Sequence, residues 1–249
     1  MPWQLPDGDA ELLQLAKGYP YTRAEGSYHF ADGQSRPLEA GCAEAGLFDD
    51  RTPVIAHGSN RSVEQLLRKF ADRAEIPVSR AFLADYDVVY SAHMTRYGAI
   101  AANLAHQPGV TGEVWVTWLD AGQLQRMHET ELGAEIYRYG TLRGIRLALE
   151  AGPVPEIDSA GVYLSSYGYL AVDGAPVGLA AVPADGRRAS AIHQGEALAL
   201  VRDRHRPRHD LDGMILGAIR DQSERLNLIE QMRAQALPPE APHFQESEV

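Results

Sequence analysis

The sequence predicts an α+β fold. Segments such as Val110–Leu119, in which β-branched and aromatic residues recur with a period near two, are typical of strands. The last third of the chain instead places apolar residues such as Ile215, Ile219, Leu226 and Ile229 near helical spacing. Predicted strands and helices do not alternate regularly through the middle of the chain, which favours an α+β arrangement over a doubly wound parallel sheet.

The predicted elements follow in order along the chain. A short helix around 12–15 and a strand at Ser27–Phe30 come first. A strand at Pro53–Ala56 ends at Gly58, and Ser62 with Gln65 forms a capping box that begins a helix. The remaining predictions are a helix over Asp120–Thr130 and strands at Val78–Tyr90, Gly98–Pro108, Val110–Leu119, Glu135–Leu149 and Ala160–Val182, the last interrupted by a hairpin turn at Asp173-Gly174.

These elements divide the 249 residues into four parts. Residues 1–50 form an N-terminal extension, and residues 51–185 form the main domain. Residues 186–236 form a helical C-terminal region. Residues 237–249 are rich in proline and acidic side chains, so we expect this tail to be disordered.

Composition excludes several functional classes. The net charge of −11 argues against a sequence-independent grip on nucleic acid, which depends on lysine and arginine. No window approaches the ~18 apolar residues of a membrane helix, and the N-terminus does not resemble a signal peptide, so we expect a cytoplasmic protein. Cys42 is the single cysteine and has no basic neighbour to activate it as a nucleophile. A small-molecule ligand is the expected partner, and a homo-oligomer is compatible with the sequence.

The first candidate for chemistry is the segment His57-Gly58-Ser59-Asn60, between a strand and a helix. Glycine lets a ligand approach the backbone, and unpaired N–H groups before a helix attract an anion such as a carboxylate. The alternative is that the segment merely turns the chain and caps the helix.

The second candidate lies at the end of the helix predicted over Asp120–Thr130. It contains His128 between Met127 and Glu129, followed by Thr130 and Glu131. A partly buried carboxylate here could act as a general acid or base. The alternative is a solvated acidic helix end, although acidic side chains in a last turn oppose the helix dipole.

Four segments, taken in their order and spacing, carry a family resemblance. They are the strand that runs into Gly58-Ser59-Asn60, the segment 98–104 (GAIAANL) before Pro108-Gly109, the segment 110–115 (VTGEVW) and the segment 124–131 (LQRMHETE). Together they resemble the γ-glutamylcyclotransferase family over about a third of the chain, from Val54 to Tyr139. Two positions depart from the family pattern, because His57 stands where the family has tyrosine and His128 where it commonly has aspartate.

The resemblance implies a small mixed β-barrel with flanking helices over residues 51–185 and an enzyme of the amine-releasing acyltransferase or lyase type. Its substrate would be a γ-glutamyl or related acyl-amino compound with an amino-acid-like head. The α-amine attacks the γ-carbonyl, closes a 5-oxoproline ring and expels the other amine, with no cofactor or metal. Glu131 corresponds to the catalytic acid/base, and the expected substrate contacts are His57, Gly58, Ser59, Asn60, His128 and Tyr137.

Proton transfer sets a condition on Glu131. Ordinary pKa values make transfer from an α-ammonium to a glutamate uphill by about 5 kcal/mol. We therefore expect Glu131 to be enclosed and its pKa to be raised by burial.

Two other functions remain open at this point. His57, His93 and His128 could converge with Glu131 on a metal and form a metal-dependent lyase or hydrolase, although no metal-ligand spacing supports this. The domain could also be a non-catalytic module that binds a small ligand, since a fold does not fix a function.

Overall fold

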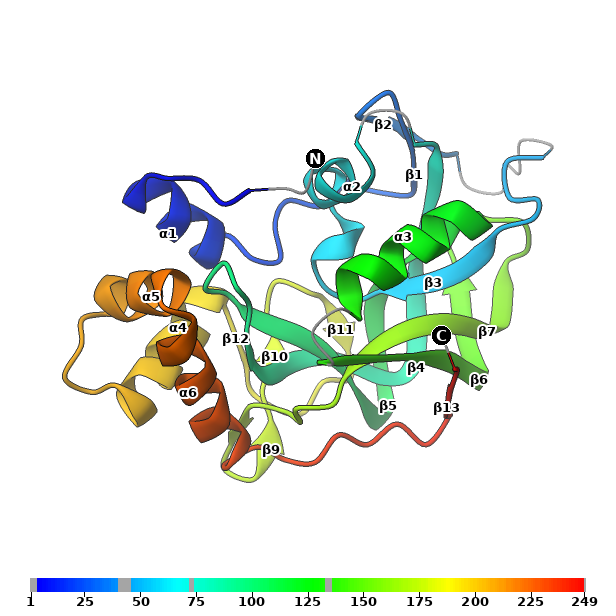
Figure 1. Ribbon diagram of the computed structural model, residues 1–249. Coiled ribbons are helices and arrows are strands. Elements are labelled where there is room, and N and C mark those ends of the chain that lie inside the picture. The colour runs from blue at the N-terminus through cyan, green and yellow to red at the C-terminus, as the bar shows by residue number, and fades with distance from the viewer. Residues whose placement is uncertain (1–3, 40–45, 72–73, 133–135, 249) are drawn as a thin grey trace.

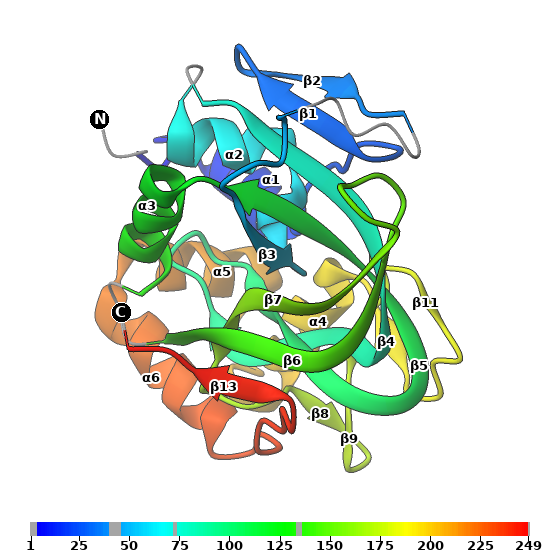
Figure 2. The same cartoon turned by 90° about the vertical axis from the view of Figure 1, so that its right-hand side faces the viewer.

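The centre of the fold is a closed barrel of five strands (Figures 1 and 2). The computed structural model describes residues 4–39, 46–71, 74–132 and 136–248. The strands pair in the order β5-β3-β7-β6-β4, and β4 pairs with β5 to close the ring. Only the β3–β7 pairing among these is parallel. The strands are β3 (Thr52–Ala56), β4 (Ile76–Met94), β5 (Ile100–Leu119), β6 (Tyr137–Leu149) and β7 (Glu156–Ser165).

The hairpin of β4 and β5 bends around the barrel through a bulge. Ala84 and Tyr86 both lie opposite Thr111, and Asp85 between them has a φ of 63°. The carbonyl oxygen of Tyr86 lies 2.7 Å from where a Cβ on Gly112 would stand, so this close approach requires glycine. The break that we expected at Pro108-Gly109 is wrong, because β5 continues through it.

Short strands extend the barrel sheet at its margins, except for one hairpin that forms a two-stranded sheet of its own. The hairpin of β1 (Tyr28–Ala31) and β2 (Gln34–Pro37) adds to β4. The turn predicted at Asp173-Gly174 is confirmed, since it joins β8 (Ala171–Val172) to β9 (Ala175–Pro176). The remaining short strands are β10 (Gly178–Leu179), β11 (Ala184–Asp185) and β12 (Ala191–Ile192).

The helices lie in two groups on the barrel (Figure 1). α2 (Val63–Phe70) packs with α3 (Ala121–Glu131), and Leu66 and Met127 are buried beneath them. The second group joins both ends of the chain, because the N-terminal α1 packs against C-terminal helices. It consists of α1 (Asp9–Lys17), α4 (Gln194–His205), α5 (Leu211–Arg220) and α6 (Gln222–Arg233). The α+β fold with a small mixed barrel and flanking helices is therefore confirmed.

The C-terminal tail differs from the prediction. Its residues Phe244–Glu246 form β13, which pairs antiparallel with β6. The expectation of a disordered tail is wrong here, because the exposed edge of β6 offers backbone partners that composition does not reveal. The described helices include none with the length and apolarity needed to cross a membrane.

Candidate active site

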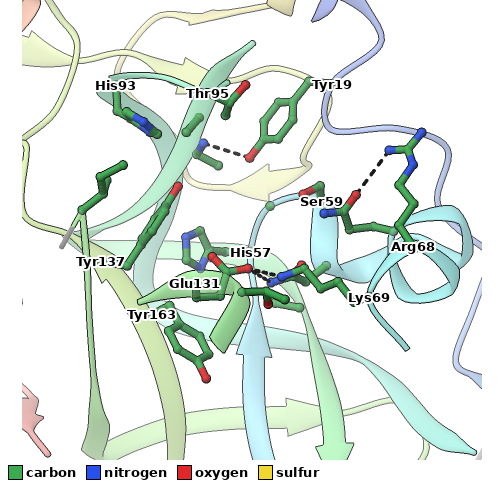
Figure 3. A pocket seen from close by; sticks show the side chains of 18 of the residues that line it. Tyr19, His57, Ser59, Arg68, Lys69, His93, Thr95, Glu131, Tyr137 and Tyr163 are labelled. Carbon is green, nitrogen blue, oxygen red and sulfur yellow. Dashed lines mark hydrogen bonds and ion pairs between the residues drawn. The ribbon is translucent and has the colours of Figure 1, made fainter. Parts of the chain in front are cut away.

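A cavity of about 420 Å³ opens beside the end of β3. Its walls come from residues 57–60, α2, the β4–β5 turn, the end of α3 and the strands β6 and β7. Tyr19 from the N-terminal segment completes the wall (Figure 3). Segments far apart in sequence thus meet in one pocket, whose volume suits a ligand of small-molecule size.

Glu131 is the last residue of α3, and its carboxylate faces the loop at residues 57–60. The helix begins with a capping box of Asp120 and Gln123. Asn60 Nδ2 donates a hydrogen bond to Glu131 Oε1 at 3.0 Å. The ammonium of Lys69 on α2 forms an ion pair with the same oxygen. The Glu131 side chain is 16% exposed and that of Lys69 is 8% exposed, so this pair lies within the cavity wall.

The charge state of Glu131 differs from the expectation. Burial raises its pKa, but the Lys69 ammonium together with hydrogen bonds from Lys69 and Asn60 outweighs burial and holds the pKa below its usual value. The predicted net increase in the Glu131 pKa is therefore wrong. The reason is Lys69, which precedes Glu131 by 62 residues. In sequence Lys69 looks like an ordinary basic residue in the last turn of a helix.

The loop at residues 57–60 presents its backbone to the cavity. Ser59–Arg61 form a short 3-10 helix, and Ser62 then caps α2 by accepting a hydrogen bond from the Gln65 N–H. A Cβ on Gly58 would lie 2.5 Å from the Tyr19 hydroxyl oxygen, so a side chain at position 58 would require Tyr19 to move. Gly58, Ser59 and Asn60 all line the cavity.

His57 and His93 are both buried in the cavity wall. Burial lowers the pKa of His57 to about 4 despite the attraction of Glu131. Burial and the charge of Arg225 lower the pKa of His93 to about 4 as well. Within the described parts of the chain, Nδ1 of each ring has no hydrogen-bond partner. Both rings are therefore neutral near pH 7, and each has a buried ring nitrogen that no described group satisfies.

His128 and Tyr137 lie in different places, although we expected both to contact substrate. Tyr137 lines the cavity, where burial and the charge of Glu131 raise its pKa well above the usual value and keep its hydroxyl protonated. His128 is not in the described lining of the cavity, because its Nδ1 lies 2.8 Å from the Tyr163 hydroxyl and its ring packs against Tyr139. Tyr163 itself lines the cavity (Figure 3), and its hydroxyl is the atom that His128 contacts.

The metal alternative finds no cluster of ligands in the parts of the chain that the structure describes. No group there of three histidine, cysteine, aspartate or glutamate side chains could hold a metal ion. The set of His57, His93, His128 and Glu131 does not converge, since His128 contacts Tyr163 instead. Cys42 lies outside the described residues, as does Glu135 at the start of the predicted strand.

Several lining residues were not found from the sequence. They are Tyr19 from the N-terminal segment, Arg68 and Lys69 from α2, and Arg96 and Tyr97 from the β4–β5 turn. With Arg126, the described lining has four basic side chains against one carboxylate, that of Glu131. Carboxylates outside the lining pair with two of these side chains, Glu64 with Arg68 and Glu129 with Arg126, so the lining itself is basic although the whole chain is acidic. The tyrosines and arginines carry no signal in sequence, because only the tertiary fold brings them together.

Comparisons with known proteins give similarity of fold. No family model and no curated protein matches the chain. A solved structure named gamma-glutamyl cyclotransferase is 17% identical, with 77% of this chain and 91% of that chain covered and a TM-score of 0.35. An uncharacterized Homo sapiens protein is 16% identical, with 80% and 95% covered and a TM-score of 0.36. An Arabidopsis thaliana protein is 14% identical, with 50% and 73% covered and a TM-score of 0.36. One of these structures thus has the name of the family that the sequence resembles, and the likeness concerns the fold alone.

Proposed function

We propose that the protein is a cyclotransferase-type enzyme that releases an amine from a γ-glutamyl or related acyl-amino compound. One observation carries the proposal: a partly buried carboxylate, that of Glu131, faces the Gly58–Asn60 loop inside a cavity of about 420 Å³. A carboxylate opposite backbone amides is suited to a zwitterionic head, because the carboxylate attracts an ammonium and the amides attract a carboxylate.

The reaction needs no external nucleophile. The α-nitrogen of the substrate forms a bond to its own γ-carbonyl carbon, which closes a five-membered 5-oxoproline ring. The bond from that carbon to the second nitrogen then breaks and releases the amine. Glu131 accepts a proton from the α-ammonium and returns one to the departing nitrogen. Holding the chain folded inside the cavity makes the attack intramolecular.

The Lys69–Glu131 ion pair has to open during this cycle. Lys69 keeps Glu131 ionised before substrate binds, which is the state that can accept a proton. The α-ammonium of the substrate is a second cation that competes with Lys69 for the same carboxylate. Once Lys69 has moved away, burial is the dominant effect on Glu131 and raises its pKa toward that of the amine.

The basic side chains of the cavity favour an anionic substrate. Arg68, Arg96 and Arg126 line the wall around the loop. We assign the α-carboxylate of the substrate to the backbone amides of Gly58, Ser59 and Asn60, and Tyr137 contributes a protonated hydroxyl to the same pocket.

The decisive experiment measures 5-oxoproline released from a panel of γ-glutamyl amino acids, peptides and amines. We expect turnover by the wild-type chain and a loss of about 100-fold or more in Glu131→Gln, because general acid–base catalysis contributes on that order. The matched control is Glu129→Gln, since Glu129 lies on the same helix but is 52% exposed and pairs with Arg126.

Two outcomes would contradict the proposal. Full activity in a folded Glu131→Gln variant would remove the acid/base role. A wild-type chain that binds these compounds and releases no 5-oxoproline would instead indicate a non-catalytic binding module.

A further inference from the structure

We propose that Tyr19 determines specificity in this site by donating a hydrogen bond from its hydroxyl to the α-carboxylate of the substrate. The inference rests on the proposed function and extends it to a segment of the chain outside the barrel. Tyr19 follows α1, so the site would be completed by residues far from the strands that form the cavity.

Tyr19 lies where its hydroxyl can reach a ligand at the Gly58–Asn60 loop. Its side chain is buried, with the residue 6% exposed, and it lines the same cavity as Glu131. The hydroxyl oxygen lies against the backbone of Gly58, 2.5 Å from where a Cβ would stand. A ligand group held by the amides of the Gly58–Asn60 loop therefore lies beside this hydroxyl (Figure 3).

The Tyr19 hydroxyl keeps its hydrogen for donation to a ligand. The Ala102 N–H donates to the Tyr19 oxygen at 2.9 Å, so this bond uses an oxygen lone pair and not the hydroxyl hydrogen. Burial and the neighbouring Tyr97 raise the pKa of Tyr19 far above its usual value, and the hydroxyl stays protonated at every working pH. The hydroxyl oxygen thus lies beside the loop with its hydrogen not used by the Ala102 bond.

The chemistry around Tyr19 selects the acceptor. Backbone amides, basic side chains and a phenol hydroxyl are all donors or cations, and together they suit an anionic oxygen. Glu131 lies elsewhere in the cavity and attracts the ammonium. A substrate that has both groups is therefore oriented, with its carboxylate toward Tyr19 and its amine toward Glu131.

The second helical group holds Tyr19 in place. Leu12 and Ala16 of α1 are buried in the same hydrophobic cluster as Met214 and Ile215 of α5. Lys17 pairs with Asp212 at 2.5 Å, and Arg220 pairs with Asp9. α1 is thus fixed to α5, and the chain leaves it two residues before Tyr19. The N-terminal and C-terminal segments together position one side chain of the cavity.

The test compares Tyr19→Phe with the wild-type chain on a compound that the wild-type chain turns over. We expect KM to rise about 10-fold with kcat within about 2-fold, because the lost bond is to a charged group present in the ground state. The control is Tyr90→Phe, which removes a buried hydroxyl that donates to the Ile192 carbonyl oxygen and does not line the cavity. Thermal unfolding of both variants checks that each is folded.

A pair of inhibitors separates contact with the carboxylate from a structural effect. 5-Oxoproline carries the carboxylate, and 2-pyrrolidinone is the same ring without it. We expect Tyr19→Phe to weaken inhibition by 5-oxoproline about 10-fold and to leave that by 2-pyrrolidinone unchanged.

The outcomes distinguish this inference from the proposed function. An unchanged KM in an active Tyr19→Phe variant, or equal weakening of both inhibitors, would overturn the role of Tyr19 and leave the cyclotransferase standing. A wild-type chain that releases no 5-oxoproline from any of the compounds would remove the proposed function and this inference with it.

Discussion

Two glutamates of this molecule, Glu113 buried and Glu131 partly buried, are held in opposite ways. Glu113 in β5 is 1% exposed at its side chain, and Arg80 donates to its Oε2 from Nε at 2.9 Å and from Nη2 at 2.7 Å. Arg23 pairs with Oε1 at 2.9 Å. Glu131 instead meets one lysine and one amide, both at Oε1, beside an open cavity.

The difference separates a structural carboxylate from one suited to chemistry. Guanidinium groups are planar, permanently charged and fixed in geometry, so Glu113 has partners that cannot release it without cost. Lysine is a flexible point charge, and Asn60 is neutral. Glu131 can exchange its partner for a ligand cation. Glu113 cannot do so as readily, because two guanidinium groups hold its two oxygens.

The largest expected effect is on stability at Glu113. Glu113→Gln removes the charge that Arg23 and Arg80 share and leaves Arg80 with Glu150 alone, and we expect a loss of about 4 kcal/mol in the free energy of unfolding. Glu131→Gln should lose about 1 kcal/mol or less, because the glutamine keeps a carbonyl oxygen for Asn60 and Lys69 and both partners border the cavity. Urea unfolding at pH 7 measures both. Equal losses of stability at the two positions would contradict the distinction between a structural Glu113 and a ligand-facing Glu131.

The next effect concerns the neutral imidazole beside Glu131. The pKa of His57 is about 4 in the folded chain and near 6.5 when unfolded, so the unfolded state binds more protons between these values. The neutral His57 ring therefore contributes its full stability above pH 6.5, and this contribution to the free energy of unfolding is lost as the pH falls toward 4. We expect His57→Gln to remove about 3 kcal/mol of this acid sensitivity.

Unfolding free energies across pH 4–7 check the His57 prediction, with exposed His209→Gln as the matched control. Wild-type acid sensitivity retained in full by His57→Gln would mean that this ring titrates normally in the folded protein.

The smallest expected effect concerns the ion pair between Lys69 and Glu131. The pKa of Glu131 is lowered in the folded chain, so its contribution to stability is present above the unfolded pKa near 4.3 and lost as the pH falls through the folded pKa. Lys69→Met removes the charge and the hydrogen bond of Lys69 and leaves burial, Asn60 and His57, so the pKa of Glu131 should rise. We expect about 2 kcal/mol less stability at pH 7, recovered as the pH is lowered.

The control for Lys69 is the same substitution in a Glu131→Gln background, where this pH dependence should vanish. Parallel pH profiles for Lys69→Met and the wild-type chain would show that the ion pair does not set the charge of Glu131.

Local patterns could predict the elements around the site. The strand ending at Ala56, the Ser62 cap and the helix ending at Glu131 all follow from neighbouring residues, whose periodicity and capping are local properties. The order of these elements also indicated that Glu131 belongs with the Gly58–Asn60 loop.

Tertiary contacts could not be predicted in the same way. Lys69 reaches Glu131 only because α2 packs on α3, and Tyr19 reaches Gly58 only because α1 packs on α5. His128 precedes Glu131 by less than one helical turn, yet its ring meets the Tyr163 hydroxyl, which belongs to a later strand. Neither spacing nor composition specifies such partners.

The contact between Gly58 and Tyr19 has a consequence for how the sequence can diverge. The phenol oxygen occupies the volume that a methyl group at position 58 would need, so alanine there is accommodated only if residue 19 becomes smaller or moves. Substitutions at these two positions should accordingly appear together in descendants of this chain, and a lineage that shortens its first helix is free to change the loop.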